Sequence, residues 1–243
     1  MKTNYKPVIY LTIVLLIFYC SALFILIPIY MFNIDINNCS DAVYNTLRVV
    51  PNIAEALLLI ILYRNTLKKD FIDFKNNFGN YSDIALKYWI LGFLAMMISN
   101  FTINLFSPVE MAANEQGVRE IISSVPIVSL FSICLMAPIA EELTFRKSFK
   151  DCFSSKWLFI LISGIVFGFL HVIGSFGSLY ELLYIIPYSA LGIAFASAYY
   201  KTNNIFVSIF IHCMHNTILV LLNILLSGVI LLWMNQELKK IMI

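Results

Sequence analysis

The chain contains seven apolar stretches, most of them long enough to cross a lipid bilayer as a helix. A helix needs about 20 apolar residues to span a hydrocarbon core about 30 Å thick. The stretches cover residues 7–32, 43–63, 84–105, 121–149, 157–171, 179–199 and 205–233. Because the backbone polar groups of a helix bond to one another, helices of this kind are stable in lipid. The sequence therefore predicts an all-α, polytopic membrane protein.

The composition supports a membrane protein and excludes a water-soluble globule. Hydrophobic residues make up 60% of the chain and charged residues 12%, whereas about 25% of the residues of a soluble domain are charged. The net charge of +2 is too small to indicate nucleic-acid binding. No repeat, low-complexity tract or linker divides the chain, so we expect residues 1–243 to form a single membrane domain within the lipid bilayer.

The last stretch, residues 205–233, allows either one crossing or two. One helix of this length would measure about 43 Å, which exceeds the hydrocarbon core. A break near Asn223 or near Ser227 and Gly228 would give two crossings and a total of about eight transmembrane helices. We therefore expect eight helices rather than seven.

The distribution of Lys and Arg favours the same number of crossings. Basic residues in short loops prefer the cytoplasmic side. With eight crossings that start inside, only Arg48 and Arg119 fall on the outer side. Seven crossings would also place Lys239 and Lys240 outside. The predicted bundle thus has cytoplasmic N- and C-termini.

Glu141, Glu142 and Arg146 lie at the end of the fourth apolar stretch. An ionisable side chain in hydrocarbon costs roughly 2.5–3.5 kcal/mol on insertion scales, and such residues are usually functional. On a helix Glu142 and Arg146 share a face and can pair, while Glu141 is rotated by about 100° and can face a cavity. The alternative is a helix that has already left the membrane, but the apolar Leu143 and Phe145 argue against it.

Two later apolar stretches each carry a polar pair with helical spacing. His171 follows Phe167 by four residues, and Asn216 follows His212 by four. An imidazole and a carboxamide one turn apart can bind a water molecule or an oxyanion. A histidine at the end of an apolar run can also be a simple interfacial residue. His215, next to Asn216, is an alternative active residue, although helix packing is the commoner role for such a side chain.

Glu55 is a further ionisable residue within an apolar stretch. Arg48 lies seven residues before it, about two helical turns away. We expect Glu55 to form an internal pair, with Arg48 as the candidate partner, rather than to act in a reaction.

Together the three motifs read Glu-Glu-x-x-x-Arg, Phe-x-x-x-His and His-x-x-x-Asn, in that order, between residues 125 and 216. This ordered set resembles the CPBP family of intramembrane proteases, also called Abi. The family includes the type II CAAX prenyl endopeptidases and proteins associated with bacteriocin self-immunity. The resemblance implies a catalytic core at residues 121–223.

The resemblance also implies a peptide-hydrolysing site in a cavity open toward the cytoplasm. Glu141, helped by His171, would deprotonate a water molecule that attacks the scissile carbonyl, and His212 and Asn216 would stabilise the oxyanion. The supporting residues would be Glu142, Arg146 and Phe167. The partner would be a peptide or a membrane-associated protein. The many Asn, Ile and Lys residues indicate a low-GC bacterial source. The protein is then expected in the bacterial cell membrane, where a bacteriocin or a peptide pheromone would be a fitting substrate.

The family resemblance leaves the metal dependence open. If zinc or another divalent ion is bound, His171 and His212 are the expected ligands and Glu141 remains the base. The five cysteines show no metal-type spacing. No cofactor is required by the sequence itself.

Two other functions compete with proteolysis. The chain could be a non-catalytic immunity or regulatory protein that retains the site, or a transporter, which would explain buried Glu and His but is expected to have repeated halves with broken helices. The catalytic side chains of an enzyme must lie at the same depth in the membrane. Counted from the basic flanks, Glu141 lies about 8–13 Å deep, His212 about 12 Å and His171 about 21 Å. A tilted helix over residues 157–171, or one whose first turns project into the cytosol, would reconcile these depths, whereas an upright helix would not.

Overall fold

The computed structural model describes residues 5–109, 111–174 and 177–241, the last fifteen of these by their backbone alone. Every regular element in this part of the chain is helical. Seven helices are long and apolar enough to cross a membrane: Lys6–Phe32, Asp41–Asn76, Phe78–Phe106, Pro126–Lys150, Lys156–Ile173, Leu179–Thr202 and Ile205–Leu226. The prediction of an all-α, polytopic membrane protein is confirmed.

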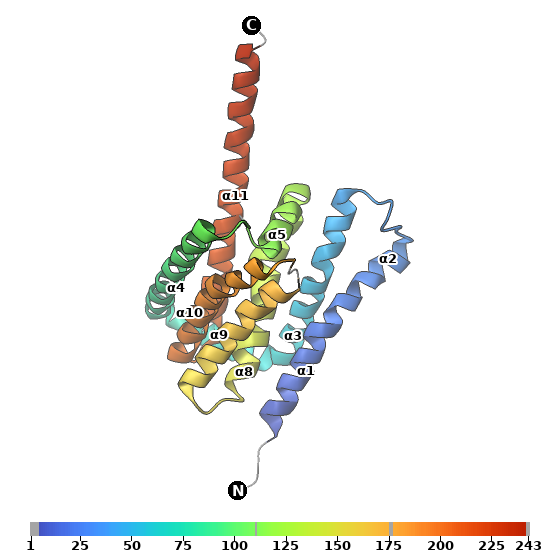
Figure 1. Ribbon diagram of the computed structural model, residues 1–243. Coiled ribbons are helices and arrows are strands. Elements are labelled where there is room, and N and C mark those ends of the chain that lie inside the picture. Colours follow the sequence, from blue (N-terminus) through green and yellow to red (C-terminus); the bar gives the residue numbers. More distant parts are fainter. Residues whose placement is uncertain (1–4, 110, 175–176, 242–243) are drawn as a thin grey trace.

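The first half of the chain forms three long helices and a short amphipathic one. Helix α1 (Lys6–Ser21) continues through a 3₁₀ turn, η1 (Ala22–Ile25), into α2 (Leu26–Phe32). Then follow α3 (Asp41–Asn76), α4 (Phe78–Phe106) and α5 (Ala113–Ser124). Asn33 ends α2 in the left-handed conformation, with φ of 50°, and the Ser40 side chain caps the start of α3. In Figure 1, α1 and α3 lie at one flank of the bundle and α4 at the other.

The second half supplies the inner helices. One continuous helical run comprises α6 (Pro126–Phe131), η2 (Ser132–Met136), α7 (Ala137–Glu141), η3 (Glu142–Lys147) and α8 (Ser148–Lys150). It is followed by α9 (Lys156–Ile173), the 3₁₀ turn η4 (Leu179–Tyr184), α10 (Ile185–Thr202) and α11 (Ile205–Ile241). Asn203, with φ of 52°, makes the left-handed turn between α10 and α11.

Helices α9 and α10 pack with their backbones in close approach, and two glycines make this possible. A Cβ atom on Gly164 would lie 2.7 Å from the backbone nitrogen of Ile193, and one on Gly192 would lie 2.8 Å from the carbonyl oxygen of Gly164. Small residues have this role in membrane helix packing. The main apolar core lies beside this contact and includes Leu59, Leu143, Phe145, Phe159, Ile160 and Ile205.

The predicted break in the last apolar stretch is wrong. Helix α11 runs without interruption from Ile205 to Ile241, so the part of the chain described has seven candidate spans instead of eight. Ser227 and Gly228 stay helical because a helix satisfies its own backbone hydrogen bonds in lipid. The cytoplasmic location of both termini stays a prediction, and it requires an eighth crossing.

Candidate active site

The two adjacent glutamates lie at the junction of a short α-helix and a π-helical segment. The segment η2 precedes the short helix α7, and η3 begins at Glu142, directly after Glu141. A π-helical turn contains more residues than an α-helical turn, and such turns are frequent at functional sites. The spacing of the motif predicts a regular α-helix here, and the structure differs. The π-helical geometry changes the direction in which each of the following side chains points.

Glu142 and Arg146 form a fully buried ion pair, as their spacing predicts. Nε of Arg146 lies 3.2 Å from Oε2 of Glu142, and neither side chain is exposed. Arg146 also donates a hydrogen bond of 3.4 Å to the carbonyl oxygen of Gly192, and its guanidinium lies 4.4 Å from the centre of the Phe167 ring. Such contacts are needed because an unpaired buried charge is strongly destabilising.

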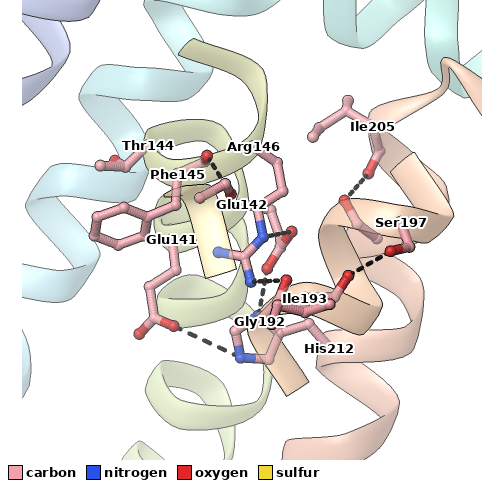
Figure 2. A network of polar contacts seen from close by, with 12 residues as sticks. Glu141, Glu142, Thr144, Phe145, Arg146, Gly192, Ile193, Ser197, Ile205 and His212 are labelled. Atoms are coloured by element: carbon pink, nitrogen blue, oxygen red, sulfur yellow. Dashed lines mark hydrogen bonds and ion pairs between the residues drawn. The ribbon is translucent and has the colours of Figure 1, made fainter. Parts of the chain in front are cut away.

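His212 joins the two glutamates (Figure 2). Its Nδ1 atom lies 2.8 Å from Oε1 of Glu142, and its Nε2 atom lies 3.6 Å from Oε2 of Glu141. The carboxylate of Glu142, held by Arg146, can only accept, so Nδ1 of His212 carries the proton that it donates. In the neutral imidazole the Nε2 atom therefore presents its lone pair to Glu141.

His171 approaches Glu141 in the same way. Its Nδ1 atom donates to the carbonyl oxygen of Phe167 over 2.8 Å, which leaves Nε2 as an acceptor 3.8 Å from Oε2 of Glu141. The imidazole lies between two rings, with centroid distances of 4.2 Å to Phe167 and 4.8 Å to Tyr188. Tyr188 was not singled out from the sequence, because nothing in its local pattern marks it.

Asn216 has a different position from its predicted partners. Its Nδ2 atom donates a hydrogen bond of 2.9 Å to the carbonyl oxygen of Ile133, within η2. One of its two N–H groups is thus used to hold α11 against the π-helical segment. The side chain still lines the same cavity as Glu141, His171 and His212.

That cavity has a volume of about 200 Å³. Concave sites with an apolar lining and a few converging polar groups are the usual form of an active site. Further polar residues in its wall are Asn52, Asn114, Glu115, Tyr188, His215 and Asn223. The sequence predicts different depths for Glu141, His171 and His212. The structure brings the three side chains together, and α9, which carries His171, runs obliquely to α11 (Figure 1).

The two remaining ionisable candidates have other contacts. His215 accepts a hydrogen bond of 3.4 Å from the Trp89 indole and is buried against aromatic rings, although it reaches the cavity wall. The expected pairing of Glu55 with Arg48 is wrong. Glu55 instead accepts a hydrogen bond of 3.0 Å from Thr144, while Arg48 bonds to Asn45 and Glu120.

The donor atoms that could face a metal ion are the Nε2 atoms of the two histidines, beside the carboxylate of Glu141. Both imidazoles have the tautomer that a metal requires, because their Nδ1 atoms are bound to acceptors. Among the residues that the structure describes, no group of three or more His, Cys, Asp and Glu has the spacing of a metal site.

Comparison with known proteins places these residues in a recognised family region. Residues 123–218 match the family model described as type II CAAX prenyl endopeptidase Rce1-like. All seven motif residues lie within that match. The resemblance inferred from the three motifs is therefore confirmed.

Several bacterial membrane proteins are similar over a larger part of the chain. The "Putative membrane peptidase YdiL" of Bacillus subtilis is 27% identical over 176 residues, which are 69% of this chain and 68% of that protein. UPF0177 protein YxdF of Lactococcus lactis is 24% identical over 64% of this chain and 86% of its own length. A protein of Mycoplasma capricolum is 30% identical over 79% of this chain and 59% of its own length. No solved structure matches.

Proposed function

Because residues 123–218 of this multi-pass membrane protein match the Rce1-like family model, we propose that the protein is an intramembrane endopeptidase in which Glu141 activates the hydrolytic water. The substrate is a peptide or a membrane-associated protein. Since the similar proteins are bacterial, a membrane peptide such as a bacteriocin or a pheromone is the substrate class that we propose.

The observation that carries this proposal is the arrangement around Oε2 of Glu141. This buried oxygen has no hydrogen-bond partner, and the Nε2 atoms of His212 and His171 lie 3.6 and 3.8 Å from it. These distances are too long for good direct hydrogen bonds. A small rotation of the Glu141 carboxylate would let one water molecule bond to all three groups. Glu141 would take a proton from that water as its oxygen attacks the carbonyl carbon, and would then pass the proton to the leaving amine.

A count of protons assigns a role to His212. A water molecule has two protons, yet in their neutral or anionic forms Glu141, His171 and His212 are all acceptors toward it. One of the three must therefore carry a proton. We assign this proton to Nε2 of His212, because its Nδ1 atom already donates to the carboxylate of Glu142, so that both ring nitrogens act as donors. The protonated Nε2 then donates to the oxyanion, together with the second amide N–H of Asn216.

The same residues offer two nitrogen ligands to a divalent ion. If zinc were bound, Nε2 of His171 and of His212 would hold it and it would polarise the substrate carbonyl. With an ion bound, Glu141 would remain the base and Glu142 would fix the tautomer of His212.

The proposal is tested by cleavage of membrane peptides in proteoliposomes. Purified protein would be reconstituted with a library of fluorogenic peptides that carry an apolar segment, and cleavage would be compared between the wild type and Glu141→Gln. We expect cleavage only by the wild type. Equal cleavage by both proteins would contradict the assigned base. Metal analysis of the active preparation, with and without a chelator, separates the two forms of the mechanism.

A further inference from the structure

The two ends of the helix bundle differ in charge. One end contains the last turns of α3, helix α8, the start of α9 and the turn between α10 and α11, and it lies near the start of α1 (Figure 1). We call this the basic end. Its basic residues are Lys6, Arg64, Lys68, Lys69, Lys75, Lys147, Lys150, Lys156 and Lys201. The opposite end carries Arg48 and Arg119 and, at the far end of α11, Lys239 and Lys240.

Side-chain contacts hold the basic end together. The amide of Asn204 donates to the carbonyl oxygen of Asp70 over 2.7 Å and to the carboxylate of Asp73 over 2.8 Å. Lys150 donates to Asn203 over 2.6 Å. These bonds join the turn between α10 and α11 to α3 and to α8. These contacts connect the helices at this end, where a cavity of about 440 Å³ is lined by Lys6, Tyr63, Lys147 and Asp151 but not by Glu141 or His171.

The space between Glu141 and the basic end is filled. Residues that follow Glu141 in the chain are completely or almost completely buried, and the first turn of α11, beside them, is buried as well. They are Glu142, Leu143, Thr144, Phe145, Arg146, Ile205, Val207 and Ser208, each with an exposed fraction of 2% or less. A packed interior of this kind leaves no room for water. The route from the basic end to Glu141 is thus blocked.

The cavity at Glu141 extends in the other direction. Its wall includes Asn114, Glu115 and Val118 of α5 and Asn223 of α11, and α5 lies at the end of the bundle opposite α8 (Figure 1). The side chain of Glu115 is 36% exposed and that of Glu141 is 24% exposed. The partly exposed Glu141 therefore shares its cavity with the partly exposed Glu115 of α5.

A second cavity of about 300 Å³ leads toward the same end. It shares wall residues with the first, among them Glu115, Tyr188 and Leu219. Its other walls come from the last turns of α4, at Asn100 and Asn104, and from the segment just before α5, at Met111 and Ala112. Both cavities therefore open away from the basic end.

Lys and Arg near the ends of membrane spans favour the cytoplasmic side, so the basic end faces the cytoplasm. We propose that the catalytic cavity opens on the outer side of the membrane and that the enzyme cleaves the exported part of a membrane peptide. This substrate class rests on the proposed proteolytic function, whereas the direction of the opening does not. It differs from the cytoplasmic opening that the family resemblance implies.

The experiment is site-directed cysteine labelling in intact bacterial cells. In a variant whose five native cysteines are replaced by Ser or Ala, single cysteines would be introduced by Asn37→Cys, Asn114→Cys and Ser154→Cys. Asn37 is exposed in the turn between α2 and α3, Asn114 lies in the cavity wall, and Ser154 is exposed between α8 and α9. We expect a membrane-impermeant thiol reagent to label the first two in intact cells, and the third only after permeabilisation.

Two results would overturn the proposal: labelling of Ser154→Cys in intact cells with Asn37→Cys protected, or protection of Asn114→Cys from the outside. If the variant without native cysteines fails to accumulate in the membrane, reporter insertions replace it. Alkaline phosphatase inserted after Asn37 should be active, and the same enzyme inserted after Ser154 inactive. These readouts need no peptidase activity. A correct orientation in a protein that cleaves nothing would contradict the proteolytic function and leave the direction of the opening intact.

Discussion

The Nδ1 atom of His212 lies 2.8 Å from Oε1 of the fully buried Glu142. The other oxygen of this carboxylate faces Arg146, so one side chain orients a histidine and neutralises a buried arginine. The neighbouring Glu141 has no hydrogen-bond partner at its Oε2 atom and lines the cavity. Two adjacent residues of the same type are therefore assigned different tasks by their surroundings, and their variants should behave differently.

Glu141→Gln should remove activity while leaving the fold intact. A positioned general base contributes about 10²- to 10⁴-fold to a rate, and we expect a loss of that size in peptide cleavage. The melting temperature in detergent should change little, because Oε2 of Glu141 has no hydrogen-bond partner. Glu120→Gln is the control, since Glu120 is 54% exposed and pairs with Arg48. Loss of folding in Glu141→Gln would show that this carboxylate has a structural role.

Glu142→Ala should destabilise the protein strongly. It leaves the guanidinium of Arg146 buried without its counter-ion, at a cost of about 3–5 kcal/mol. The double variant Glu142→Leu with Arg146→Met should recover much of the stability, because apolar side chains can replace a buried pair. It should still lack activity, since His212 has lost its acceptor. Thermal unfolding and cleavage assays measure the two effects, and wild-type activity in the double variant would contradict the role of Glu142.

The ring of Tyr188 should matter more than its hydroxyl group. The ring lies 4.8 Å from that of His171, and the hydroxyl accepts a hydrogen bond of 3.3 Å from Asn114. Tyr188→Phe keeps the stacking and should retain most of the kcat. Tyr188→Leu removes it and should lower kcat by about 10-fold or more, because small displacements of a catalytic group cost up to about 10²-fold. Equal kcat values for the two variants would exclude a positioning role for the ring.

Gly164→Ala should weaken the packing of α9 on α10. The new Cβ atom would lie 2.7 Å from the backbone nitrogen of Ile193, so the helices must separate, and overpacking of this kind costs about 1–3 kcal/mol. Cleavage should also fall, since α9 carries His171. Gly174→Ala is a matched control, because a Cβ atom there has nothing within 4 Å. Similar melting temperatures for the two variants would contradict the close contact.

The membrane helices could be predicted from the sequence because apolar length is a local property. The exception is α11, in which Asn223, Ser227 and Gly228 resemble a break and yet remain helical. Inside a membrane the alternative to a helix is an unsatisfied backbone, so residues that would end a helix in water do not end it here. The charge pattern favours an eighth crossing, which the uninterrupted α11 does not provide.

The polar pairs with a spacing of four residues were found because helical geometry brings such residues together. Contacts between side chains on different helices of the bundle could not be predicted in this way. The bond between His212 and Glu142 joins residues 70 positions apart, and that between Thr144 and Glu55 joins residues 89 positions apart. Only the packing of several helices creates these pairs, and no pattern along the chain marks them.

The π-helical segments η2 and η3 lie directly before and after α7, which ends at Glu141. Each behaves as a single-residue insertion into an α-helix. Deletion of one residue from η2 would rotate everything beyond it by about 100° around the helix axis, and Glu141 would leave the cavity with its motif still complete. The spacing between Pro126 and the glutamates is thus as important as their identity. A relative that is one residue shorter in this interval would turn a different side chain toward its histidines.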